Sequence, residues 1–201
     1  MRGRLFQYLR GQQKYSMPIN FIKEIISGGQ TGVDRAALDI AIEFKIPHGG
    51  WCPYERKAED GMIPTKYKLK EAPPPTIEES LDPDAIYKKR TELNARDSDG
   101  TLIIIKNMPM GGTLYTIEMA EKHKKPYLIF NLSINHEILD AVNWIIKNNI
   151  RKLNIAGPRA SQVSGINASA YNILQQLLNH PLLNKNTHGL IEKEIIRRTN
   201  R

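Results

Sequence analysis

One segment near the N-terminus constrains the fold more than any other part of the sequence. Residues 23–27 form an apolar run typical of a buried strand, residues 28–32 are the glycine-rich sequence GGQTG, and a helical pattern starts at Asp34. Glycines let the backbone approach an anion closely, and the free N–H groups in the first turn of a helix point towards it. The segment therefore predicts a strand–loop–helix unit that binds an anion, with a purely structural turn as the alternative.

The body of the sequence alternates between short apolar runs and longer amphipathic runs. This alternation predicts an α/β fold, with a mainly parallel sheet and helices on both of its faces. Residues 47–80 fit the alternation poorly and are interpreted as a long irregular insertion. The predicted strands are 23–27, 101–106, 126–130 and 152–156, and the predicted helices are 34–44, 82–95, 113–123, 135–149 and 166–178.

A second glycine cluster follows the predicted strand 101–106. It contains Gly111, Gly112 and Thr113, and a helical pattern begins directly after it. Loops at the carboxyl ends of strands in a doubly wound sheet converge on one crevice. Because two helix N-termini would then face the same crevice, the pattern favours an anionic ligand over a neutral one.

Several polar residues outside the glycine loops are also candidates for a site. Asp97 and Asp99 precede a predicted strand and could meet a ribose, a pterin or a metal, although Asp-Ser-Asp-Gly is equally a good turn sequence. Arg159 follows a predicted strand and could bind a phosphate. Glu59 and Asp60 form an adjacent acidic pair, which is typical either of acid–base catalysis or of a solvated loop.

The net charge of +8 is concentrated at the two ends of the chain. Residues 1–22 carry four basic and no acidic residues, and the body of the chain is almost neutral. Basic ends of this kind are typical of solvated tails, so nucleic-acid binding is the least favoured interpretation. We assign residues 1–22 as a basic N-terminal extension, residues 23–178 as one domain, and residues 179–201 as a helical or disordered tail. Met17, followed by Pro18, is an alternative start of the chain.

The sequence favours a cytoplasmic protein that does not span a membrane. No apolar run approaches the roughly 20 residues needed to cross a bilayer, and residues 1–15 lack the apolar core of a secretory signal. Cys52 is the single cysteine, which suits a reducing compartment. The five histidines show no metal-ligand spacing, so we predict no protein-ligated metal.

These motifs together resemble one known family. The chain resembles the putative molybdenum carriers, a circularly permuted, YpsA-like branch of the SLOG group of Rossmann-like domains. The resemblance covers roughly residues 23–178. The motifs that carry it are SGGQTGVDRAALD (27–39), GGWCP (49–53), AEDG-IP (58–64), RT--N--DSDGTLI (90–103), GGT--T (111–116) and LN-AGPR (153–159).

The resemblance implies a Rossmann-like three-layer αβα fold, a ligand crevice at the glycine loops, and a homo-oligomer. It also implies a carrier or binding role for a phosphate-bearing small molecule. The family takes its name from proteins that bind the molybdenum cofactor (molybdopterin), and a nucleotide-like molecule is the other ligand that we expect. The predicted phosphate contacts are Gly28, Gly29, Gln30, Thr31, Gly32, Arg35, Gly111, Gly112, Thr113, Thr116 and Arg159, and the predicted ring or sugar contacts are Trp51, Asn94, Asp97 and Asp99.

A related branch, the LOG or lysine decarboxylase-like enzymes, leaves a hydrolase as the alternative function. These enzymes cleave the N-glycosidic bond of nucleoside monophosphates, and their motif resembles PGGxGTxxE. Alignment on Gly112 and Thr113 puts Thr116 at the glutamate position, and Glu118 lies about 200° further around the helix, so we expect it to point elsewhere. A hydrolase would then need a different acid or base; the candidates are Glu59, Asp60 and Asp97.

Overall fold

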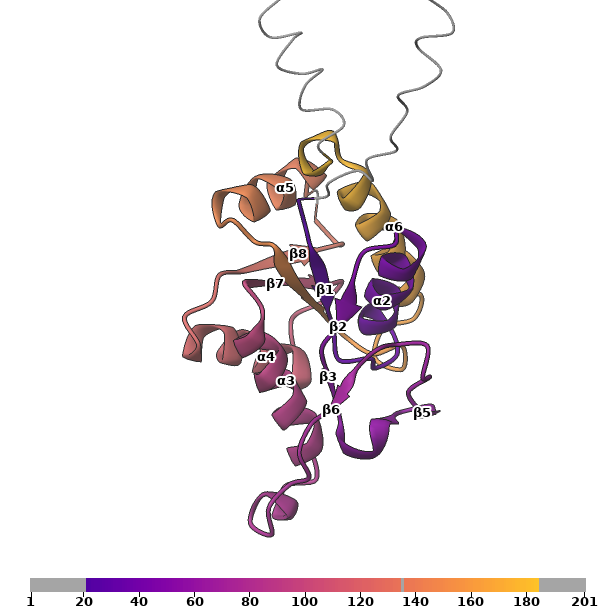
Figure 1. Ribbon diagram of the computed structural model, residues 1–201, viewed down its shortest axis with the longest axis vertical. Coiled ribbons are helices and arrows are strands. Elements are labelled where there is room, and N and C mark those ends of the chain that lie inside the picture. Colours follow the sequence, from indigo (N-terminus) through magenta and orange to yellow (C-terminus); the bar gives the residue numbers. More distant parts are fainter. Residues whose placement is uncertain (1–20, 135, 185–201) are drawn as a thin grey trace, which may run out of the picture.

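The computed structural model describes residues 21–134 and 136–184, and its centre is a five-stranded parallel sheet (Figure 1). The strand order is β2-β1-β9-β7-β8, and helices cover both faces of the sheet. This arrangement confirms the predicted α/β, Rossmann-like fold class. The strands are β1 (Glu24–Ile26), β2 (His48–Gly49), β7 (Gly100–Ile105), β8 (Tyr127–Asn131) and β9 (Lys152–Ala156).

Two groups of helices form the outer layers. Helices α2, α5 and α6 pack together on one side, and α3 and α4 pack against each other on the other side. Strand β7 shows why both layers are needed, because all six of its residues are buried. Successive side chains of a strand point to opposite faces, and Leu102 and Ile104 join the α2–α6 core while Ile103 is equally buried. The helices are α2 (Val33–Glu43), α3 (Ala85–Asp97), α4 (Gly112–Lys122), α5 (Ile138–Lys147) and α6 (Ile166–Asn179).

The strand order has a simple interpretation when counting starts at β7 instead of β1. The sequence of strands then becomes 2-1-3-4-5, which is the order of a flavodoxin-like doubly wound sheet. The topological switch point of such a sheet lies between its first and third strands, here β7 and β9. The two ends of the described chain also meet, since the N–H of Phe21 donates to the carbonyl of Leu183 at 2.7 Å. Both observations are those expected of a circular permutation.

The insertion at residues 47–80 is an ordered structure in its own right. Besides β2 it contains two small sheets, which the sequence did not predict, and the side chain of Arg56 ties it together. The guanidinium donates to four backbone carbonyls of residues 63–69, at 3.0 to 3.2 Å, and Cys52 and Ile63 are fully buried. The small strands are β3 (Trp51–Cys52) with β6 (Lys70–Glu71) and β4 (Lys57–Ala58) with β5 (Gly61–Met62); the 3₁₀ turns are η1 (Tyr54–Arg56), η2 (Glu79–Leu81) and, near the C-terminus, η3 (Pro181–Leu183).

The basic tails fall almost wholly outside the described residues, as does Asn135 at the predicted start of α5. The described chain continues past residue 178, and Leu183 is buried in the main core. None of the helices in residues 21–134 and 136–184 combines the length and apolarity that a membrane crossing requires.

Candidate functional site

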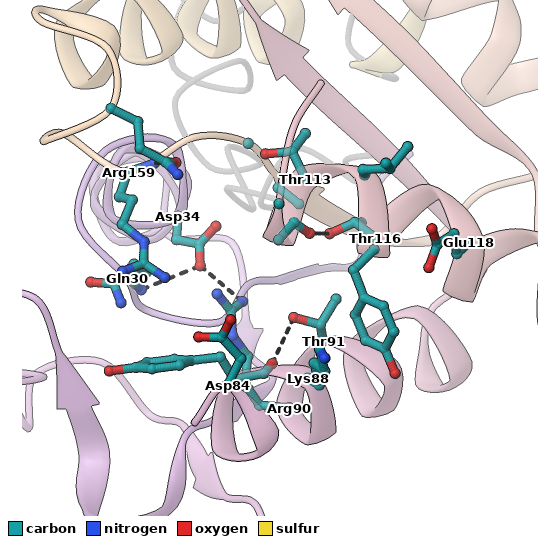
Figure 2. Close-up of a pocket in the computed structure, with 18 residues that line it drawn as sticks. Gln30, Asp34, Asp84, Lys88, Arg90, Thr91, Thr113, Thr116, Glu118 and Arg159 are labelled. Carbon is teal, nitrogen blue, oxygen red and sulfur yellow. Dashed lines mark hydrogen bonds and ion pairs between the residues drawn. The ribbon is translucent and has the colours of Figure 1, made fainter. Parts of the chain in front are cut away.

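The main cavity of the described chain lies at the switch point between β7 and β9. Its volume is about 480 Å³, within the range of small-molecule sites. The walls come from four places: the first glycine loop, helix α3, the N-terminus of α4, and the loop after β9 (Figure 2). The position agrees with the rule that ligands of doubly wound sheets bind outside the carboxyl ends of the strands at the switch point.

The second glycine loop opens directly into this cavity. Gly111 is the N-cap of α4 and Gly112 is its first residue, and no side chain caps this helix end. A Cβ atom on either glycine would meet nothing within 4 Å. Thr113 and Thr116 also line the cavity, and the hydroxyl of Thr116 donates to the carbonyl of Gly112 at 2.9 Å. The helix N-terminus is therefore open to an anion.

A buried ion pair forms the floor of the cavity. Nη1 of Arg90 lies 3.0 Å from Oδ2 of Asp34, whose side chain is only 3% exposed. The backbone N–H of Gln30 donates to the same oxygen at 3.2 Å. Burial raises the pKa of Asp34 above its ordinary value, and the charge and hydrogen bond of Arg90 oppose that rise. A Cβ at Gly28 would stand 1.7 Å from Nη1 of Arg90, so any larger residue there would push the guanidinium away from this ion pair.

The first glycine loop is arranged very differently from the second. Its polar groups are bonded within the protein: the N–H of Thr31 donates to Oε1 of Gln30 at 3.1 Å, and the hydroxyl of Thr31 donates to the carboxylate of Glu59. The N–H of Val33, at the start of α2, donates to the carbonyl of Pro158 at 3.3 Å. Within GGQTG, Gln30 is the residue that lines the cavity; Gly28, Gly29, Thr31 and Gly32 are not among the lining residues.

Glu59 and Asp60 hold the β4–β5 hairpin against the first glycine loop. The carboxylate of Glu59 accepts hydrogen bonds from the hydroxyls of Thr31 and Ser161. Burial tends to raise the pKa of Glu59, but these hydrogen bonds outweigh it and lower the pKa. Asp60 accepts two hydrogen bonds from Arg35, at 2.5 and 2.7 Å, which lower its pKa. Neither acid lines the cavity, and Arg35 does not line it either.

The four predicted ring or sugar contacts lie away from this cavity. The side-chain amide of Asn94 makes two hydrogen bonds to the backbone of Trp51: it accepts from the N–H at 2.7 Å and donates to the carbonyl at 2.9 Å. The indole N–H of Trp51 donates to Asp97 at 2.8 Å. Asp99 accepts from the backbone N–H groups of Arg151 and Lys152, at the amino end of the sheet. The structure thus brings these residues into the packing of α3 and the sheet edge, and does not bring them to the cavity.

Arg159 does reach the cavity, and it meets an aromatic residue that the sequence analysis missed. Its guanidinium carbon lies 5.3 Å from the ring centroid of Tyr87 on α3. Three further missed lining residues occupy the same stretch of chain. The spacing of the four residues is i, i+3, i+4 and i+7, which puts them on one helix face and was the signal that could have revealed them. They are Asp84, Tyr87, Lys88 and Thr91.

Glu118 requires a correction, because it was expected to point elsewhere and instead lines the cavity. The cavity follows the groove between α3 and α4, so that more than one side of α4 borders it. Thr116, at the position of the hydrolase glutamate, is buried, whereas Glu118 is exposed at the border of the cavity (Figure 2).

Comparisons with known proteins agree with this architecture. The model of the circularly permutated YpsA SLOG family matches residues 25–178. A similar solved structure is the crystal structure of a putative molybdenum carrier protein from Syntrophus aciditrophicus SB, at 44% sequence identity. The match covers 79% of this chain and 96% of that chain, with a TM-score of 0.69. The comparison with curated proteins gave no match.

Proposed function

Because this chain belongs to the circularly permuted YpsA family of SLOG domains, we propose that it is a binding or carrier protein for a phosphate-bearing small molecule. The observation that carries the proposal is the uncapped N-terminus of α4 at the wall of the switch-point cavity. The N–H of Thr113 is bonded to the carbonyl of Met110 at 3.1 Å, but the helix dipole and the absence of a side-chain cap favour a negative charge at that place. Arg159 adds a guanidinium, a group well suited to phosphate.

The molybdenum cofactor is the first ligand to consider, and a nucleotide-like molecule is the second. The solved relative is named a putative molybdenum carrier, and both ligands join a phosphate to a flat heterocycle. The residues around the cavity fit such a group: Gly111, Gly112 and Thr113 offer an anion site, and Tyr87 offers an aromatic surface. The cavity volume of about 480 Å³ leaves room for more than a phosphate.

The proposal is tested by calorimetric titration of the purified protein with molybdopterin and with nucleoside monophosphates. The matched control for each nucleotide is the nucleoside that lacks the phosphate. We expect the phosphorylated form to bind at least about tenfold more tightly, which corresponds to about 1.4 kcal/mol. If every phosphorylated ligand fails to bind the folded protein, the proposed function is wrong. Mass spectrometry of whatever co-purifies with the native protein would identify the ligand directly.

Two further parts of the proposal concern where and in what state the protein works. We propose that it acts in the cytoplasm, where its single cysteine, buried Cys52, stays reduced. We also propose a homo-oligomer, since Met108 and Met110, beside the α4 N-terminus, are large apolar side chains left 83% and 73% exposed. Light scattering on the eluting protein measures the subunit number, and a monomer at all concentrations would contradict the second part.

A further inference from the structure

The side-chain amide of Gln30 has a fixed orientation. Its Oε1 accepts two hydrogen bonds, from the backbone N–H of Thr31 at 3.1 Å and from the backbone N–H of Glu59 at 3.0 Å. Both partners can only donate, so the atom that faces them must be the amide oxygen. The NH₂ group is therefore directed to the opposite side.

That NH₂ group has no hydrogen-bond partner among the described residues, although Gln30 is only 4% exposed. Nε of Arg90, on the cavity floor, is a second buried donor that has no hydrogen-bond partner among the described residues. Buried donors are almost always paired in native proteins, and an unpaired one is costly. Since Gln30 and Arg90 both line the cavity, a ligand that brings an acceptor atom would satisfy this need.

The rest of the cavity indicates what carries that acceptor. Figure 2 shows Thr113, at the α4 N-terminus, and Gln30 in different parts of the cavity wall, so a ligand that meets both would present a phosphate to one and a second polar group to the other. The ring of Tyr87 and the guanidinium of Arg159 also line the cavity and lie 5.3 Å from each other, and both groups pack well on flat rings. A flat heterocycle with a hydrogen-bond acceptor at its edge fits these features.

We propose that Gln30 is a specificity-determining residue, whose NH₂ group donates to a ring carbonyl oxygen of a phosphorylated oxo-heterocycle. The inference rests on the proposed function, because it takes the phosphate at α4 as the other anchor of the ligand. The chemical class includes 6-oxopurine nucleotides and 4-oxopterins. A 6-aminopurine presents a donor at the same edge and opposes the NH₂ group, so the site selects against it.

The β4–β5 hairpin positions Gln30 for this contact. One of the two N–H groups that hold Oε1 belongs to Glu59 at the tip of the hairpin. The hairpin is in turn fixed by the carboxylate of Glu59 on Thr31 and Ser161, and by the bidentate pair of Asp60 with Arg35. The insertion at residues 47–80 thereby orients Gln30 towards the ligand, although Glu59 and Asp60 do not line the cavity themselves.

The test uses three purine ribonucleoside 5′-monophosphates that differ only at ring position 6. Inosine monophosphate has a carbonyl, adenosine monophosphate has an amino group, and purine riboside monophosphate has a hydrogen. Calorimetry on the full-length wild-type protein should give about tenfold tighter binding of inosine monophosphate than of either other ligand. The key variant is Gln30→Glu, which keeps an acceptor for Thr31 and Glu59 but replaces the outward donor with an acceptor. Gln30→Met, with neither group, is the second variant.

We expect Gln30→Glu to invert or abolish the preference for the carbonyl. Its added negative charge should also lower the affinity for all three ligands. Gln30→Met should bind the three ligands about equally. Equal affinities in the wild type, or an unchanged preference in a folded Gln30→Glu variant, would overturn the inference and leave the proposed function standing. If none of the three binds and inorganic phosphate also fails to bind, the proposed function is overturned and this inference with it.

Discussion

The two glycine loops of this protein look alike in sequence and differ in structure. Each follows a parallel strand and opens a helix, yet the loop at residues 28–32 is bonded to the protein's own acceptors, whereas the loop at Gly111 and Gly112 faces an open cavity. In the first loop, Asp34 and Glu59 take the place that an external anion would have. A glycine-rich turn supplies hydrogen-bond donors, and the rest of the fold decides whether a ligand or the protein itself satisfies them.

The largest expected effect tests whether the first loop is structural. Asp34→Ala removes the carboxylate that pairs with Arg90, whose side chain is only 15% exposed, and leaves a largely buried guanidinium without its partner. We expect a loss of about 3–5 kcal/mol in the free energy of unfolding. Urea denaturation measures it, and the matched control is Asp60→Ala. The two guanidinium groups are similarly buried, but the carboxylate of Asp60 is 48% exposed against 3% for Asp34, so the Arg35–Asp60 pair is open to water and should contribute less than about 1 kcal/mol. Equal losses in the two variants would contradict this assignment.

The second prediction tests whether the second loop binds the anion. Gly112→Asp puts a carboxylate in the first turn of α4, where it stabilises the helix but repels a phosphate. Since there is space for a side chain, the variant should fold, and the affinity for a phosphorylated ligand should fall by about a hundredfold. Gly112→Ala is the control and should retain binding. If Gly112→Asp binds as well as the wild type, the anion does not sit at this helix end.

The third prediction compares the glycines of the two loops directly. Gly32 has a φ of +78°, and a Cβ there would stand 2.4 Å from the carbonyl oxygen of Pro158. We expect Gly32→Ala to cost at least about 2 kcal/mol of stability. Gly112→Ala, in open space at the start of a helix, should be neutral or slightly stabilising. Thermal unfolding of both variants measures the difference in stability between them. Similar melting temperatures would contradict the prediction.

The smallest expected effect concerns the carboxylate that closes the first loop. Because the pKa of Glu59 is lowered in the folded protein, its contribution to stability is present above the unfolded pKa of about 4.3 and is lost as the pH falls below it. Glu59→Gln should therefore be slightly less stable than the wild type at pH 7 and should match it more closely near pH 3. Denaturation curves at the two pH values measure the difference. If the difference in stability between the wild type and Glu59→Gln is larger at pH 3 than at pH 7, Glu59 is not held as a charged acceptor.

The sequence predicted the parts of this molecule that follow a local rule. Strand β9 and helix α6 lie where the burial pattern and the helical period put them, because a strand covered on both faces is continuously apolar and an amphipathic helix repeats every 3.6 residues. Gly111, Gly112 and Arg159 were found at the cavity for a similar reason, since the carboxyl ends of parallel strands share one edge.

The remaining features depend on contacts between distant residues, which no local pattern shows. Asp34 and Arg90 are 56 positions apart, and Thr31 and Glu59 are 28 positions apart. The turn motif therefore indicated an anion site in the first loop without showing which side chains already fill it. Trp51 and Asp97 were chosen for their chemistry alone, and their hydrogen bond to each other shows that the same chemistry serves packing.

The place of β9 in the sheet has a consequence for how the protein is made. This strand lies between β1 and β7 and supplies Ala156, Gly157 and Arg159 to the cavity, yet residues 152–156 leave the ribosome after both neighbouring strands. Until they arrive, β1 and β7 have no strand to join them, and the pocket lacks one wall. The cavity wall is therefore complete only after residues 156–162 have left the ribosome, later than all the other residues that line it.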